Sequence, residues 1–148
     1  KKEEEGYQLI LKARLYDMVA ILLRNIPYQE YEPAENTRQK KQRIKLKNVF
    51  EFVEKNYTEE ITLDIVADIA NYSLYYFSRF FKQATGMTFG QYLDHFRIRK
   101  AEWLLINRDD SITEVAYNAG FNNIKTFYRV FKKIKECTPG EYRDSVMK

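Results

Sequence analysis

The sequence predicts a bilobed all-α domain in which two helix-turn-helix subdomains are joined by a long helix, with an amphipathic helix at the N-terminus. The first observation is a repeat with a period of 50 residues, a spacing typical of repeated supersecondary units. The second is the low content of helix-interrupting residues, with 5 Gly and 3 Pro among 148 residues. The third is a set of three capping boxes, in which Ser or Thr is followed three residues later by Glu or Gln. The repeated residues are Phe77, Arg79, Phe81, Lys82, Thr88, Gly90 and Tyr92, which recur as Phe127, Arg129, Phe131, Lys132, Thr138, Gly140 and Tyr142.

The N-terminal part of the chain is predicted to hold one helix and one linker. Within residues 1–25, apolar side chains of 7–25 follow helical spacing, which predicts an amphipathic helix. Residues 26–41 contain Pro27 and Pro33 with many charges and no periodicity, which is typical of a linker. Because the chain begins with Lys, it is expected to be a piece of a longer protein.

The first lobe is predicted over residues 42–88 and contains three helices. Apolar residues between 46 and 57 favour one helix, 63–70 a short second helix, and 74–85 the third. The residues expected to cap these helices or to form their turns are Thr62, Asn71, Ser73 and Gly86.

The joining helix is predicted over 89–107, and the second lobe over 108–148. Apolar side chains of the joining helix, Trp103 among them, are expected to be buried. The second lobe is expected to hold a short helix at 112–119 and a longer one at 123–135. Gly120 is expected to form the turn between them, and a last helix starts at Pro139, where proline is well tolerated. The three capping boxes pair Thr88 with Gln91, Ser111 with Glu114, and Thr138 with Glu141.

The composition argues against enzymatic chemistry. Cys137 and His95 are the only Cys and His, so an internal disulfide and the usual metal clusters are excluded, and a Cys–His pair is the one nucleophilic arrangement left. There is no phosphate-binding glycine loop, and no apolar run approaches the ~20 residues needed to span a bilayer. We therefore expect no catalytic residue, no metal, no cofactor and no membrane partner, and a reducing, cytoplasmic setting.

The function prediction depends on the second helix of each helix-turn-helix unit. On a helical wheel, Phe77, Phe81 and Ala84 form the inner face of the first, and Phe127, Phe131 and Ile134 that of the second. The net charge is only +4, but residues 73–85 and 122–135 contain no acidic residue. The opposite faces carry Tyr75, Ser78, Arg79 and Lys82 in the first helix, and Lys125, Tyr128, Arg129, Lys132 and Lys133 in the second.

Such faces fit the major groove of DNA, where Arg donates two hydrogen bonds to guanine. Arg79 and Arg129 are the first candidates for reading bases, with Ser78, Tyr75, Lys125 and Tyr128 beside them. Lys82, Lys132 and Lys133 lie further along and suit phosphates. Ile124 either packs in the core or contacts a thymine methyl. Exposed cations are usually only solvated surface, but the same pattern in two matched units favours the DNA interpretation.

These segments resemble the DNA-binding region of the AraC family of transcriptional regulators, over about residues 42–148. In the second half the resemblance is carried by Ile112-Thr113-Glu114-Val115-Ala116, Gly120-Phe121, Phe127-Tyr128-Arg129-Val130-Phe131-Lys132-Lys133 and Thr138-Pro139-Gly140-Glu141-Tyr142-Arg143. The resemblance implies seven helices, with both recognition helices in successive major-groove segments on one face of the DNA. The base-facing residues it implies are Tyr75, Ser78, Arg79, Ile124, Lys125, Tyr128 and Arg129. The sequence departs from the family at Asn71, Phe89 and Glu136, where Gly, Pro and Gly are common, and the last departure puts the local turn in doubt.

The resemblance also implies partners. Double-stranded DNA is the first, RNA polymerase is a further one, and activation is the expected mode of regulation. Residues 7–25 resemble the closing helix of a sensory, dimer-forming domain, so a small-molecule effector would bind only to a missing N-terminal domain. That helix either joins two chains in a homodimer or packs on its own chain, and both alternatives stay open.

Two other functions remain as alternatives. One is a helical protein-interaction module, which would show little salt-dependent binding to duplex DNA. The other is the DNA-binding part of a larger, multifunctional protein such as a repair enzyme.

Overall fold

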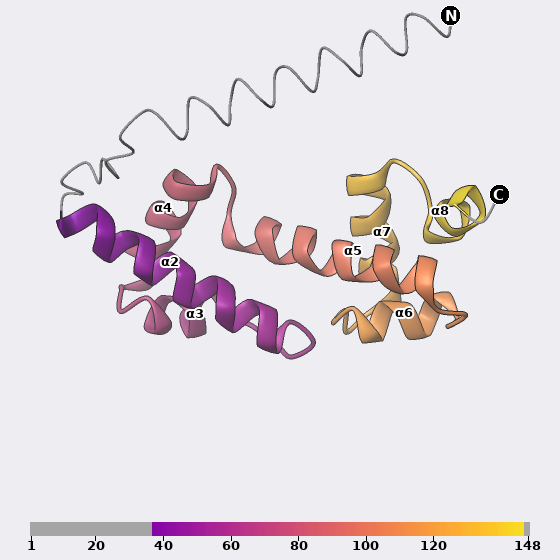
Figure 1. The fold of residues 1–148 in the computed structure, drawn as a ribbon, viewed down its shortest axis with the longest axis horizontal. Helices are drawn as coiled ribbons and strands as arrows, with labels where there is room; N and C mark the ends of the chain where they lie inside the picture. The colour runs from indigo at the N-terminus through magenta and orange to yellow at the C-terminus, as the bar shows by residue number, and fades with distance from the viewer. Residues whose placement is uncertain (1–36, 147–148) are drawn as a thin grey trace, which may run out of the picture. The chain divides into compact units, whose positions relative to one another are not determined.

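The computed structural model describes residues 37–146, which form seven α-helices and contain no strand (Figure 1). The all-α fold class is therefore confirmed. The predicted helix at 7–25 lies outside the described residues, as does most of the predicted linker. The helices are α2 (Thr37–Asn56), α3 (Leu63–Ile69), α4 (Leu74–Thr85), α5 (Phe89–Asn107), α6 (Ile112–Asn118), α7 (Ile124–Lys135) and α8 (Pro139–Val146).

Most helices begin at a side chain that accepts hydrogen bonds from the first turn, as the sequence predicts. Thr62 caps α3 and Ser73 caps α4, as predicted, and Asn123, expected as the first residue of its helix, caps α7. All three capping boxes form, and in the last the Thr138 amide donates to Glu141 Oε2 at 2.7 Å. Helix α2 begins at Thr37, before the domain start expected at residue 42.

Two separate hydrophobic cores lie at the two ends of α5. The first is built from α2, α3, α4 and the start of α5, and the second from the end of α5 with α6 and α7. Helix α5 contributes Phe89, Leu93 and Phe96 to the first core and Ile98, Ala101, Leu104 and Leu105 to the second. At about 100° per residue, these two sets occupy adjoining sides of the helix, which meet at Leu93 and Leu104. One continuous helix therefore serves both lobes.

Two core predictions are wrong. Trp103 is 56% exposed, although it points to the same side of α5 as Phe89 and Phe96. It lies about two turns beyond Phe96, past the end of the first core, so that core does not cover it. Ala84 is also exposed, because it lies in the last turn of α4, beyond Phe81.

The 50-residue repeat is a repeat of core packing. The ring centroids of Phe77 and Phe81 are 5.5 Å apart, and so are those of Phe127 and Phe131. Phe81 meets Tyr92 edge-on at 5.6 Å, and Phe131 meets Tyr142 edge-on at the same distance. Edge-to-face contacts at such distances are favourable beyond the area they bury. The matched residues therefore build the same interior twice.

The turns also match between lobes. Asn71 (φ 50°) and Gly120 (φ 90°) adopt left-handed conformations between the two helices of each helix-turn-helix unit. Gly86 ends α4 and Glu136 ends α7, again with positive φ. The turn at Glu136 therefore forms with a residue other than glycine, and the doubt raised by this departure is answered.

Candidate nucleic-acid interface

The second helices of the two helix-turn-helix units are α4 and α7. In Figure 1, both extend to one side of α5, whereas α3 and α6 lie on the other side. Helix α5 has 19 residues and is therefore about 28 Å long. Neighbouring major-groove segments on one face of B-form DNA are about 34 Å apart. The length of α5 is thus of the same order as the separation between two such segments.

The outer face of α4 is exposed. Tyr75 is 71% exposed, and Ser78, Arg79 and Lys82 are exposed with it. Arg79 Nη1 donates a hydrogen bond to the Tyr75 hydroxyl at 3.4 Å, and the guanidinium carbon lies 5.7 Å from the ring centroid. Because a guanidinium carries five N–H donors, this contact leaves donors for another acceptor.

The outer face of α7 is exposed in the same way. Lys125, Arg129, Lys132 and Lys133 are exposed, and Tyr128 is 40% exposed while its ring meets Phe127 edge-on. Ile124 is only partly buried, packed against the second core, and its contact with DNA stays a prediction. All the other residues predicted to face DNA therefore lie at the surface of α4 or α7.

Sequence reasoning missed Asp94, which lies on α5 beside α7. Burial raises the pKa of the Asp94 carboxyl, while the charges of Arg97, Arg129 and Lys133 act in the opposite direction. An acidic group therefore lies among the cations next to α7. The sequence carried no signal for it, because Asp94 and Arg129 lie on different helices.

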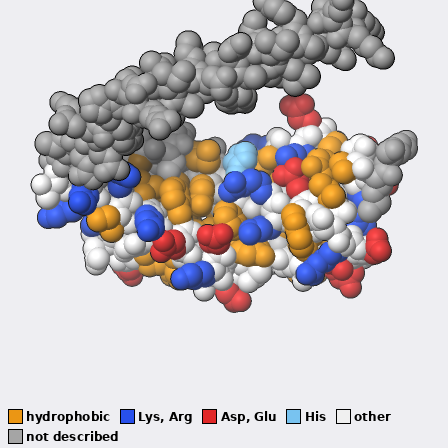
Figure 2. Space-filling view, viewed as in Figure 1, with side chains coloured by type: hydrophobic (Ala, Val, Ile, Leu, Met, Phe, Trp, Pro, Cys, Tyr) orange, Lys and Arg blue, Asp and Glu red, His pale blue; other side chains and the backbone are white. Residues whose placement is uncertain are grey.

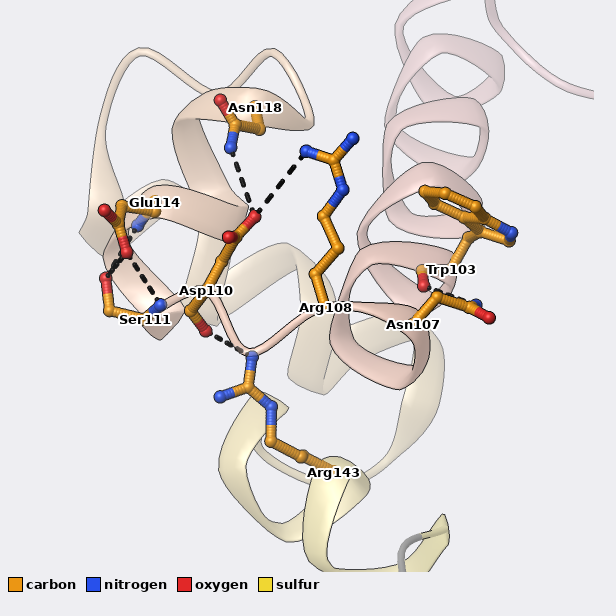
Figure 3. Close-up of polar contacts among 8 residues, drawn as sticks. All are labelled: Trp103, Asn107, Arg108, Asp110, Ser111, Glu114, Asn118 and Arg143. Atoms are coloured by element: carbon orange, nitrogen blue, oxygen red, sulfur yellow. Dashed lines mark hydrogen bonds and ion pairs between the residues drawn. The ribbon is translucent and has the colours of Figure 1, made fainter.

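The connection between α5 and α6 is fixed by a set of polar contacts (Figure 3). Arg143 of α8 donates from Nη2 to the Asp110 carbonyl oxygen at 2.6 Å. The Asn118 amide donates to the Asp110 carboxylate at 3.5 Å, and the Ser111 hydroxyl donates to Glu114 at 2.7 Å. These contacts tie α6 and α8 to the connection that follows α5, and α6 in turn packs against α7.

The remaining surface is of a different kind. On the face drawn in Figure 2, basic side chains are interspersed with acidic and apolar ones. A groove lined by residues of α2, α5 and the end of α6 contains aromatic side chains, including Trp103, together with Arg99, Lys100 and Arg108. The Arg108 guanidinium carbon lies 5.9 Å from the Trp103 ring. Since the outer faces of α4 and α7 carry no acidic residue, they are the more uniformly basic surface.

Comparison with known sequences gives consistent matches. The profile of a helix-turn-helix domain family matches residues 66–145. The bifunctional transcriptional activator/DNA repair enzyme AdaA of Bacillus subtilis is 35% identical over 95 residues, which are 64% of this chain and 45% of that protein. The transcriptional activator RhaS of an Enterobacter species is 34% identical over 99 residues, or 67% of this chain and 36% of that protein. The chain thus spans less than half the length of these two relatives.

Solved structures show the same fold. The DNA-binding domain of AdpA, a global transcriptional factor solved in complex with a target DNA, has a TM-score of 0.65 and 28% identity over 68% of this chain and 90% of its own. An AraC-type regulator from Chromobacterium violaceum has a TM-score of 0.65 and 26% identity over 70% of this chain and 93% of its own. The fold and the paired basic helices are those of helix-turn-helix proteins that bind DNA and regulate transcription. This chain belongs to the AraC-type family of these regulators, as predicted.

No helix within residues 37–146 has the length and apolar content that crossing a bilayer requires. In the same range, no group of three or more His, Cys, Asp or Glu side chains is placed to hold a metal ion.

Proposed function

We propose that this chain binds a specific sequence of double-stranded DNA by inserting α4 and α7 into successive segments of the major groove, and regulates transcription from that site. One observation carries the proposal: two helices with matching exposed, acid-free basic faces extend to the same side of one joining helix. A DNA duplex offers the matching repeat, because its major groove returns to the same face once per helical turn.

The residues divide into two roles. Arg79 and Arg129 read guanines with paired hydrogen bonds, each worth about 1–3 kcal/mol of discrimination. Tyr75, Ser78, Lys125 and Tyr128 reach neighbouring bases, whereas Lys82, Lys132 and Lys133 bind phosphates and set the register without reading sequence. Ile124 packs partly against the second core, and its remaining surface contacts a thymine methyl group.

Further parts of the proposal concern the whole protein. Activation, with RNA polymerase as a partner, is favoured because AdaA and RhaS are both described as activators. Residues 1–25 are assigned to the end of a sensory or dimerisation domain and 26–41 to the linker, whose last residues, from Thr37 on, form the start of α2. An effector would therefore bind outside the described residues. The chain acts by binding, without catalysis of its own, and in the cytoplasm. The relatives reported above are regulators, and the enzyme activity in the name of AdaA is assigned to that protein alone.

The test is selection of preferred duplexes from a random pool. We expect a site with two parts whose centres are one helical turn apart, and a binding constant that falls with salt by a log–log slope of about −0.9 for each phosphate neutralised. Lys55→Ala provides a matched control, because it removes an exposed cation from α2 without touching α4 or α7. Failure to enrich any sequence, or the same loss of affinity in Lys55→Ala as in Arg129→Ala, would contradict the proposal.

A further inference from the structure

Arg97 of α5 donates hydrogen bonds to two residues that lie 40 and 38 positions earlier in the sequence. Its Nε donates to the Tyr57 carbonyl oxygen at 2.8 Å, and its Nη2 donates to the Glu59 carbonyl oxygen at 2.8 Å. Both acceptors belong to the connection between α2 and α3, in the first lobe. Hydrogen bonds from a charged donor are about twice as strong as neutral ones. Two of them from one planar guanidinium fix the orientation of the connection relative to α5.

The same connection meets the second lobe. A Cβ atom at Gly120 would overlap the Tyr57 carbonyl oxygen and would lie 2.9 Å from Arg97 Nε. The guanidinium carbon of Arg97 also lies 6.0 Å from the centroid of the Phe121 ring. The turn between α6 and α7 therefore packs against the connection between α2 and α3, with Arg97 between them.

Arg97 also occupies the point where α5 passes from one lobe to the other. Phe96 belongs to the first core and Ile98 to the second, and no buried residue is shared between the two cores. On the helical wheel, Arg97 lies next to Leu104, at the edge of the side that the second core covers, and about 40° from Leu93 of the first core. Apart from α5 itself, the contact around Arg97 therefore connects the lobes directly.

We propose that Arg97 is a positioning residue that holds the α2–α3 connection against the α6–α7 turn and so sets the spacing between the two parts of a DNA site that this protein accepts. The structural part of the inference is that Arg97 holds the lobes together, and it stands independently of the proposed function. The DNA part, that Arg97 sets the accepted spacing, rests on the proposed function. Without the two hydrogen bonds of Arg97, the α2–α3 connection keeps the contact of Lys100 Nζ with the Tyr57 ring, 5.3 Å from its centroid, but loses the bonds that hold it beside the α6–α7 turn. The lobes then rotate relative to each other about α5.

The structural part is tested without DNA. Spin labels are attached at Asp68→Cys on α3 and Thr113→Cys on α6, both exposed positions, in a Cys137→Ser background. Their distance distribution is then measured with Arg97 intact and in Arg97→Met. We expect a single narrow distribution with Arg97 and a clearly broader one without it. An unchanged width in a folded Arg97→Met variant would overturn the proposal.

Two further variants make the result specific. Arg99→Met is the matched control, because Arg99 lies on the same helix but is exposed, and it should leave the distribution narrow. Arg97→Lys keeps the positive charge but loses the planar guanidinium that donates both hydrogen bonds, so it should give a distance distribution of intermediate width. This variant provides the test even if Arg97→Met fails to fold. A distribution as narrow in Arg97→Lys as in the parent protein would also contradict the proposal.

The DNA part uses the duplex selected in the experiment above, with base pairs inserted or removed one at a time between its two parts. The parent protein should lose at least about tenfold in affinity for each such change, which corresponds to losing one bidentate base contact. Arg97→Met should bind the original spacing more weakly and lose less than about threefold when the spacing changes. A spacing profile as steep as that of the parent would refute the role of Arg97. If no duplex binds the parent protein, the proposed function fails, while the label distances still decide the structural part.

Discussion

Replacing Phe127 with Ala tests whether the two lobes are separate folding units. The Phe127 ring is fully buried in the second core, 5.2 Å from the Phe121 ring centroid and 5.5 Å from that of Phe131. Truncating a buried Phe to Ala costs about 3–5 kcal/mol, from lost transfer free energy and the cavity left behind. At roughly 0.05–0.15 kcal/mol per residue, the ~50 residues from Ile98 onward hold only about 2–7 kcal/mol of stability. The substitution should therefore unfold much of the second lobe.

The assay is amide hydrogen exchange resolved along the chain, with Phe77→Ala as the matched variant in the first lobe. Phe77 is equally buried and belongs to the first core alone. Phe127→Ala should abolish protection in α6, α7 and the end of α5 and leave α2–α4 protected, whereas Phe77→Ala should do the reverse. If either substitution removed protection evenly from both lobes, the division into two cores would not describe the stability of the molecule.

Four further predictions concern single side chains. Arg129→Ala should relax preference at one or two base pairs of the selected site, measured by binding to singly substituted duplexes. Lys132→Ala should weaken all duplexes about equally and reduce the salt slope by about one unit. Glu136→Gly should raise the free energy of unfolding in urea by about 1 kcal/mol, because Glu136 has φ 61° and glycine adopts this conformation without strain. The hydrogen bond from the Ser111 side chain and, second to it, the one from the Ser111 backbone lower the pKa of Glu114. This carboxylate therefore stabilises the fold above its ordinary pKa of 4.5, and the stabilisation is lost as the pH falls below that value. Glu114→Gln should therefore reduce the loss of thermal stability on acidification below that pH.

Each of these four predictions is contradicted by a specific result. Unchanged discrimination at every base pair in Arg129→Ala would remove Arg129 from base reading. A loss confined to one sequence in Lys132→Ala would count against a phosphate contact. A destabilised Glu136→Gly protein would mean that the Glu136 side chain contributes more than the strain it causes. Equal acid sensitivity in Glu114→Gln and the parent would show that the capping carboxylate does not govern this transition.

Local chemistry explains why so much of the fold was predictable. Helix starts depend on side chains within one turn, so Thr62, Ser73, Thr88 and Ser111 indicated them correctly. The repeated Phe and Tyr residues identified both cores because core spacing repeats along the helix.

Features that depend on contacts between distant segments were not predictable. Trp103 has a core-like position on the helical wheel, but its exposure depends on where the first core ends. Asp94 and Arg97 act on groups of other helices and loops, to which no sequence spacing relates them. The roles of the α4 and α7 side chains in reading DNA remain predictions for the same reason, since they depend on a partner molecule.

The twin interiors have a consequence for how such a regulator diversifies. The two halves share interior rings, such as Phe77 with Phe127, and two outward cations, Arg79 with Arg129 and Lys82 with Lys132. The other outward positions differ, as with Tyr75 against Lys125 and Ser78 against Tyr128. Recognition and folding are thus encoded by nearly disjoint sets of positions. Substitutions at the outward positions of one half therefore change the DNA sequence that it prefers while its interior stays intact. New binding specificities become accessible one half at a time.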